Sequence, residues 1–148
     1  MSAVASARQE LRPGTPAAGY TAVAILAVTF LFHAYWALGG DWGAATAYGS
    51  TDLPPRGVVA VVALLIAGAG GVVLGRMGLW LQALPQRVFR LGTWACVAAF
   101  TLAGLGNLTA PADSYARDWH VFVIGPLLLA LAALCALVDR RAGRRSAV

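Results

Sequence analysis

Residues 57–75 read GVVAVVALLIAGAGGVVLG, a run with no charged or strongly polar side chain. An α-helix rises about 1.5 Å per residue and the hydrocarbon core of a bilayer is about 30 Å thick, so a run of this length nearly spans it. Because lipid offers no partner to backbone N–H and C=O groups, a spanning segment closes its hydrogen bonds internally, as a helix does. This stretch therefore predicts a transmembrane helix.

Three further apolar runs lie on either side of this stretch. Together the runs predict helices at about 18–38, 57–75, 91–108 and 119–138. Of the 148 residues, 59% are hydrophobic and only 11% are charged, and the mean hydropathy is +0.72. A soluble domain is nearer half apolar and a quarter charged. The chain is therefore expected to be all-α, a four-helix transmembrane bundle over residues 19–138 that lies in the lipid bilayer.

The segments outside the runs complete the expected organisation. Residues 1–18 read as a disordered leader, and residues 139–148 as a basic cytoplasmic tail. The first run is longer than the apolar part of a signal peptide, so it is expected to stay as a helix. Residues 77–84 resemble an interfacial continuation of the second helix that Pro85 stops. Pro126 should bend the fourth helix, because it removes one backbone N–H.

The arginines predict the orientation. All eleven basic residues are arginine. Cytoplasmic segments of membrane proteins carry an excess of basic residues. Only Arg56 and Arg117 lie on one side of the runs, whereas the other side holds Arg8, Arg12, Arg76, Arg87, Arg90, Arg140, Arg141, Arg144 and Arg145. Both termini are therefore expected in the cytoplasm of a cell-membrane protein. Arginines dispersed in this way do not form the clustered basic face of a nucleic-acid-binding protein.

Small residues repeat every four positions along the second run, at Ala63, Ala67, Gly71 and Gly75. Helices in lipid associate where small residues allow their backbones to approach closely. The stripe is thus expected to pack within the bundle, and a homodimer through the same four residues is the alternative. Cys96 and Cys135 show no redox or zinc spacing, and a contact between these two thiols is left open.

Polar and aromatic side chains gather where the first helix ends and the fourth begins. An interfacial aromatic belt and a helix-capping Asp118 would explain many of them. His33 fits this explanation less well, because an ionisable group inside an apolar run normally faces the bundle interior or a wet cavity. The candidate catalytic residues are therefore His33, Asn107, Asp118 and His120, and the candidate ligand-binding residues are Tyr35, Trp36, Asp41, Trp42 and Trp119.

Histidine suits acid–base chemistry, since it changes protonation near neutral pH and a carboxylate can fix its tautomer. We expect His33 to pair with Asp118 or His120, near Asn107, just beneath the outer surface. No metal is expected, because the histidines lack a ligand spacing such as H-x-x-x-H. No cofactor is expected either.

The pattern H-x-Y-W-A-x-G-G-x-W-G resembles a family of short bacterial four-helix membrane proteins of unknown function. It is carried by His33, Tyr35, Trp36, Ala37, Gly39, Gly40, Trp42 and Gly43. The resemblance supports the four-helix fold and singles out this motif, but it implies no activity. His120 stands where the family has an aspartate, and the third helix lacks the family's arginine near its outer end.

Three classes of function follow from these features. The first is an outer-face site for a lipophilic small molecule, which would serve binding or an isomerase or cyclase reaction. The second is a non-catalytic membrane partner or assembly subunit that works through its small-residue stripe. The third is a small transporter element. The sequence disfavours transport, because no charged residue lies near the centre of any run and no inverted repeat relates the halves.

Overall fold

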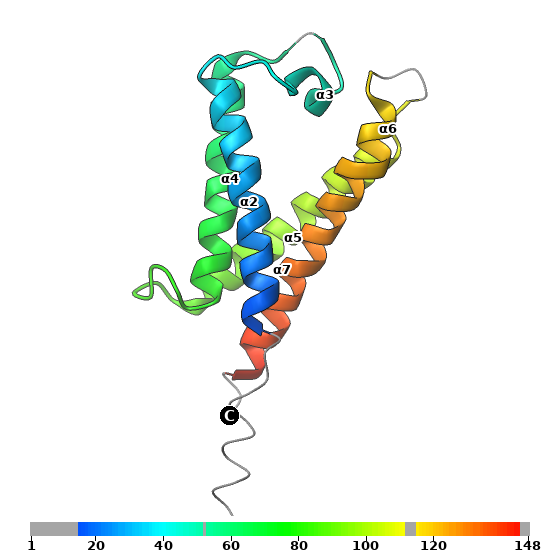
Figure 1. Cartoon of the computed structure of the whole chain (residues 1–148). Coiled ribbons are helices and arrows are strands. Elements are labelled where there is room, and N and C mark those ends of the chain that lie inside the picture. The colour runs from blue at the N-terminus through cyan, green and yellow to red at the C-terminus, as the bar shows by residue number, and fades with distance from the viewer. Residues whose placement is uncertain (1–14, 52, 112–114, 146–148) are drawn as a thin grey trace, which may run out of the picture.

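The computed structural model describes residues 15–51, 53–111 and 115–145, and the regular elements in these ranges are all helical (Figure 1). The short elements are α3 (Ala44–Tyr48), α6 (Arg117–Trp119) and the π-helical turn η1 (His120–Ile124). The long helices are α2 (Thr15–Ala37), α4 (Arg56–Arg76), α5 (Gln86–Leu108) and α7 (Gly125–Arg145). Four stretches of the described chain are long and apolar enough to cross a membrane: Ala17–Ala37, Arg56–Arg76, Gln86–Leu108 and Arg117–Gly143. The prediction of an all-α fold with four helices long and apolar enough to span a membrane is confirmed for the described residues.

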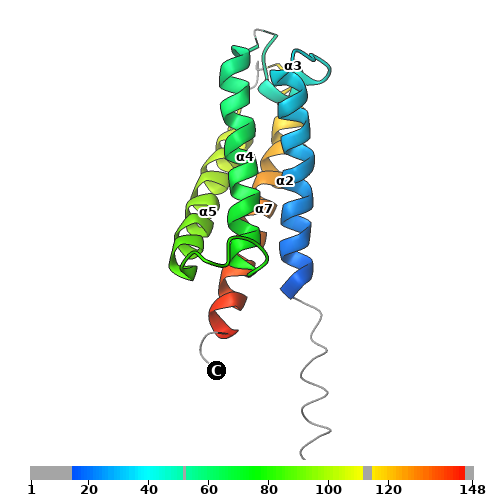
Figure 2. The same cartoon turned by 90° about the vertical axis from the view of Figure 1, so that its left-hand side faces the viewer.

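The long helices pack as two pairs, α2 with α4 and α5 with α7. The pairs meet where α2 begins and α7 ends, and they spread apart toward the opposite end (Figure 1). We call that opposite end the α3 end, because α3 lies there between the two pairs, and the other end the Arg76 end. Turning the molecule shows the four helices running side by side along its long axis (Figure 2). The two pairs are therefore closest at the Arg76 end and farthest apart at the α3 end.

The core lies toward the Arg76 end, where the pairs converge. Its buried members come from α2, α4 and α7, and they are Ala22, Leu26, Val73, Leu131 and Cys135. Cys96 of α5 packs against this cluster, and both cysteines are free thiols. The two cysteines therefore belong to one apolar core and form no disulfide.

The small-residue stripe of α4 is covered in part by aromatic rings of the same chain. A Cβ atom added to Gly71 would lie 2.3 Å from Cζ3 of Trp80, and one on Gly75 would lie 2.1 Å from Cε1 of Phe89. Ala63 is buried, whereas Ala67 is exposed. Gly71 thus leaves room for the ring of Trp80, and Gly75 leaves room for the ring of Phe89 on the neighbouring helix α5.

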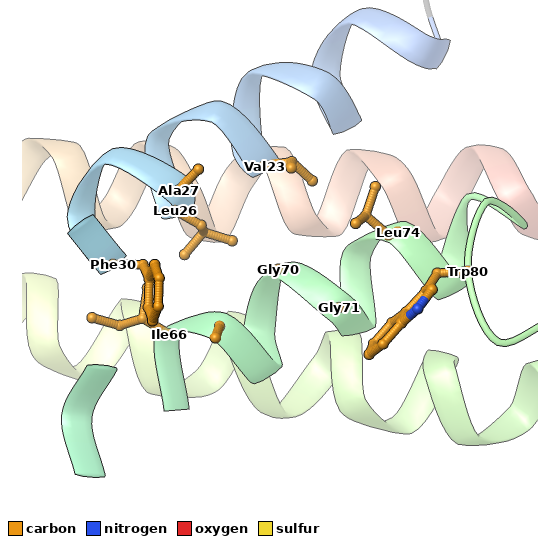
Figure 3. Close-up of a pocket in the computed structure, with 10 residues that line it drawn as sticks. Val23, Leu26, Ala27, Phe30, Ile66, Gly70, Gly71, Leu74 and Trp80 are labelled. Carbon is orange, nitrogen blue, oxygen red and sulfur yellow. The ribbon is translucent and has the colours of Figure 1, made fainter. Parts of the chain in front are cut away.

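The interpretation of residues 77–84 as a helical continuation is wrong. α4 ends at Arg76, and the chain turns there through positive φ values at Gly78 (78°) and Leu81 (47°). This turn folds Trp80 back onto α4. The groove that Trp80 closes runs between α2 and α4 with a volume of about 330 Å³, and Figure 3 shows Phe30 near its other end. The groove is lined by apolar residues of α2 and α4, among them Ala67 and Gly70.

Three helix boundaries differ from the sequence-based expectation. The third helix starts at Gln86 rather than at residue 91, because Pro85 precedes its first turn and the polar residues there are helical too. The fourth continues to Arg145, so the segment expected as a tail is helical through that residue. The leader expected at 1–18 overlaps α2 from Thr15 onward, and residues 1–14 lie outside the described part.

The chain accommodates Pro126 through η1. In this turn the N–H of Gly125 bonds to the carbonyl of His120, five residues earlier. A π turn contains one extra residue per turn, and such turns are often found at functional sites. Directly before the proline, where the sequence predicts a bend, the chain forms a π-helical turn that begins at His120.

Candidate functional site at the α3 end

Two glycines end α2 and turn the chain toward α3. The N–H of Gly40 bonds to the carbonyl of Tyr35 and the N–H of Gly39 bonds to that of Trp36, both at 3.0 Å. This pair of bonds is a Schellman motif, which favours glycine at the residue with positive φ. That residue is Gly39, with φ 108°, and a Cβ there would lie 2.9 Å from Nη2 of Arg56. The pair Gly39–Gly40 is therefore explained by the way α2 ends.

The tryptophans of the same motif hold the following loop against α2. The indole N–H of Trp36 donates to the carbonyl of Trp42 at 2.9 Å. The ring of Trp42 stacks on Phe32, with centroids 6.1 Å apart, although Trp42 is still 71% exposed. Gly43 then adopts φ 74° and starts α3. As a result Ala44 is buried against Trp36 and Val59.

His33 faces this cluster from the preceding turn of α2. Its Nδ1 lies 2.9 Å from the carbonyl oxygen of Thr29. A carbonyl only accepts, so Nδ1 carries a proton and, in the neutral ring, Nε2 is left as an acceptor. The ring centroid lies 4.9 Å from that of Trp36 and 6.1 Å from that of Tyr48, both edge to face. His33 is thus half-buried in an aromatic environment and has a fixed tautomer.

Tyr48, at the end of α3, was not among the residues chosen from sequence. Its hydroxyl oxygen is buried and has no hydrogen-bond partner within the described residues. Burial raises the pKa of this hydroxyl above its ordinary value of 10.0, so it stays protonated at neutral pH. An unsatisfied buried hydroxyl costs about 1–3 kcal/mol. In the sequence, Tyr48 could have been chosen as a site residue only because it is an aromatic residue in a short polar loop, and this signal is weak.

His120 connects the two helix pairs. Its Nδ1 contacts Oδ1 of Asn107 on α5, and its Nε2 lies 3.0 Å from the carbonyl oxygen of Thr46 on α3. Asn107 donates its amide N–H to the carbonyl of Ala103 at 2.8 Å, which fixes its oxygen toward His120. Both ring nitrogens therefore face acceptors. A ring with protons on both nitrogens satisfies both contacts, whereas a neutral ring donates to only one.

The expected group of four polar residues is thus divided. Asn107 and His120 are joined, but in the described residues no hydrogen bond links His33 to Asn107, Asp118 or His120. The side chain of Asp118 is 87% exposed and lies 3.8 Å from Arg117. Within the described residues Asp118 therefore makes no hydrogen bond or ion pair with either histidine, contrary to the sequence-based expectation. Asp118 does not cap its helix either, since Ala116 stands at that position.

Of the five candidate ligand-binding residues, one is buried and four are exposed. Trp36 is the buried one, at 8% exposure. Tyr35 packs its ring over Gly40, where a Cβ would lie 2.1 Å from it, and is otherwise exposed. Asp41, Trp42 and Trp119 are also exposed. Within the described ranges, no three His, Cys, Asp or Glu side chains come together as a metal site.

A buried polar network at the Arg76 end was missed by the sequence reasoning. Asp139 of α7 accepts a bond from Nε of Arg76 at 2.8 Å and one from the indole N–H of Trp94 at 3.1 Å. Arg76 also donates to Gln86 at 3.2 Å. Arg76 and Asp139 are 7% and 6% exposed. Each stands at the end of an apolar run, so the sequence places Arg76 in the connection after the second helix and Asp139 in the basic tail.

Comparison with known proteins decides the family. The family model described as "Protein of unknown function (DUF3995)" matches residues 26–135. The chain belongs to the DUF3995 family. The match runs from the middle of α2 into α7. It includes the polar residues of the α3 end, whereas Asp139 of the network at the Arg76 end lies beyond it. No curated protein and no solved structure matches the chain.

Proposed function

We propose that this DUF3995 protein crosses the cell membrane four times with both termini in the cytoplasm. The support is the distribution of arginine over the described helix ends. Arg76, Arg87, Arg90, Arg140 and Arg141 belong to the Arg76 end, whereas the α3 end has Arg56 and Arg117. Basic residues concentrate on the cytoplasmic side. The α3 end then faces outward.

We further propose that the α3 end binds a lipophilic small molecule that carries a hydrogen-bond acceptor, such as a carbonyl group. The observation that carries this proposal is the buried hydroxyl of Tyr48, which lacks a partner among the described residues. Unpaired buried donors are rare in folded proteins and call for a functional or structural reason. A ligand oxygen that accepts this hydrogen bond would supply one.

His33 and Trp36 give the proposed site its chemistry. The neutral imidazole of His33 presents Nε2 as an acceptor, because Nδ1 is used by Thr29. Trp36 contributes an apolar ring that contacts both His33 and Tyr48. With the hydroxyl of Tyr48 polarising a ligand carbonyl, Nε2 of His33 would accept a proton from the adjacent carbon and return it to another carbon. This is the acid–base chemistry of an isomerase.

The experimental test is to identify a small molecule that stays bound during purification. The protein would be purified in mild detergent and its bound small molecules extracted and identified by mass spectrometry. Tyr48→Phe removes only the hydroxyl, so it should lower the amount of a bound carbonyl compound at least about tenfold, as loss of one buried hydrogen bond predicts. Tyr20→Phe is the matched control, because Tyr20 is 53% exposed near the start of α2. Equal ligand content in both variants would contradict the proposal.

The two other functions have less support. For transport, the buried charges of the described chain, Arg76 and Asp139, lie at one end of the bundle rather than at the midplane. For a homodimer through Ala63, Ala67, Gly71 and Gly75, the rings of Trp80 and Phe89 would have to leave Gly71 and Gly75. Transport would therefore require a charged residue near the midplane, and a homodimer through these four residues would require both rings to move.

A further inference from the structure

We propose that α3 is a hinged lid over the Tyr48–His33 site and that His120 is its latch. The inference rests on the proposed function, because it concerns access to the same site. The hydroxyl of Tyr48 is enclosed when α3 is in place. A ligand can reach this group only if α3 moves away from α2, so access depends on what holds α3 down.

The hinges are glycines on both sides of α3. Gly43 has φ 74° and Gly49 has φ 66°, and together they bracket the five residues Ala44–Tyr48. Glycine adopts these backbone conformations readily and also leaves them readily, which suits a position that must rotate. A Cβ on Gly43 would meet nothing within 4 Å. Backbone rotation at this first hinge is therefore not restricted by neighbouring side chains.

The latch is the contact between Nε2 of His120 and the carbonyl of Thr46, at 3.0 Å. It reaches α3 from the opposite helix pair, since His120 opens η1 and is held by Asn107 of α5. On its other side α3 buries Ala44 and packs Tyr48 against Trp36. Among the described residues, α3 is thus held by the hydrogen bond to His120 on one side and by apolar packing on the other.

The closed lid leaves one polar group unsatisfied, and this favours opening when a ligand is present. In the closed state Tyr48 donates to no described group, whereas in the open state a ligand or water can accept its hydrogen. Active-site lids generally belong to the less stable parts of a fold, because they must open and close. Loss of the latch should shift the lid toward its open state.

Movement of α3 can be measured through the reactivity of a cysteine introduced on its buried side. Ala44 is 1% exposed, so Ala44→Cys should react slowly with a water-soluble maleimide while α3 is closed. Adding His120→Ala should raise this rate about tenfold, the factor that one lost hydrogen bond supplies. Leu38→Cys is the control, because Leu38 is 87% exposed in the same loop and should react equally fast in both backgrounds. The unmodified chain gives the blank for Cys96 and Cys135.

A second variant keeps the test decisive if His120→Ala does not fold. A Cβ on Gly49 would lie 2.9 Å from Nε2 of His120, so Gly49→Ala should push against the latch and also raise the labelling rate. If folded protein with either change labels no faster than Ala44→Cys alone, the lid is overturned. The assay needs no ligand. Faster labelling without a retained small molecule would therefore support the lid and contradict the proposed function.

Discussion

Nε of Arg76 lies 2.8 Å from Oδ1 of Asp139, and the two side chains are 6% and 8% exposed at the end of the bundle opposite α3. The pair joins α4 to α7, and Trp94 extends it to α5. Removing one member of a buried ion pair leaves an uncompensated charge, which costs about 3–5 kcal/mol, whereas apolar replacement of both is often tolerated. This relationship makes the Arg76 end the fixed end of the molecule.

Arg76→Met should therefore lower the free energy of unfolding by about 3–5 kcal/mol, because Asp139 then loses its buried partner. Among the described residues its remaining ion-pair contact is a long one with Arg90, whose Nε lies 3.9 Å from Oδ2 and whose side chain is 68% exposed. The measurement is unfolding in detergent, followed by circular dichroism. The double variant Arg76→Met, Asp139→Leu should regain most of the loss. Arg140→Gln is the control, since Arg140 is exposed one residue further along α7. An equal loss in the control would argue against a specific role for the pair.

Tyr48→Phe should leave the free energy of unfolding unchanged or raise it by about 1–3 kcal/mol, because it removes a buried hydroxyl without a partner. Equilibrium unfolding at neutral pH checks this. A clear loss of stability would mean that the hydroxyl has a partner in the folded protein.

The same hydroxyl predicts a pH dependence at high pH. Burial raises the pKa of Tyr48 in the folded state above its ordinary value of 10.0. The folded state thus holds this proton more tightly, so the associated stability is complete below pH 10 and is lost as the pH rises through the folded-state pKa. The difference in the free energy of unfolding between the parent protein and Tyr48→Phe should therefore change above about pH 10. A constant difference from pH 7 to pH 11 would contradict it.

Gly71→Leu should lower the free energy of unfolding by about 1–3 kcal/mol, because the new side chain meets the ring of Trp80. Gly68→Leu is the matched control on α4, since a Cβ there meets nothing within 4 Å. The added change Trp80→Ala should relieve part of the loss in Gly71→Leu. Similar melting of the two leucine variants would show that Trp80 does not cover Gly71.

Topology can be tested with single cysteines in intact cells. Leu38→Cys at the α3 end should react with a membrane-impermeant maleimide from outside, whereas Gln82→Cys, in the turn after α4, should react only after permeabilisation. Both parent residues are exposed, so neither change should disturb packing. The reverse pattern would invert the proposed orientation and place the Tyr48 site on the cytoplasmic side.

The amino-acid sequence by itself determined the four helices that are long and apolar enough to span a membrane, and the local end of the first helix. Lipid leaves backbone groups no other partners, so apolar length translates directly into helices. The pair Gly39–Gly40 marks where α2 stops, because a Schellman motif involves only neighbouring residues. These features depend on local chemistry, and local chemistry can be read from a short window of sequence.

Only the tertiary structure decided which polar groups meet. Arg76 and Asp139 are 63 residues apart, and His120 and Thr46 are 74 residues apart. Asp118 was expected beside a histidine and instead faces outward with Arg117. Hydropathy gives the depth of a residue along its helix but not the direction in which its side chain points, nor which helices pair. The direction follows from packing, and at the α3 end it follows from a five-residue helix whose position no periodic pattern in the sequence encodes.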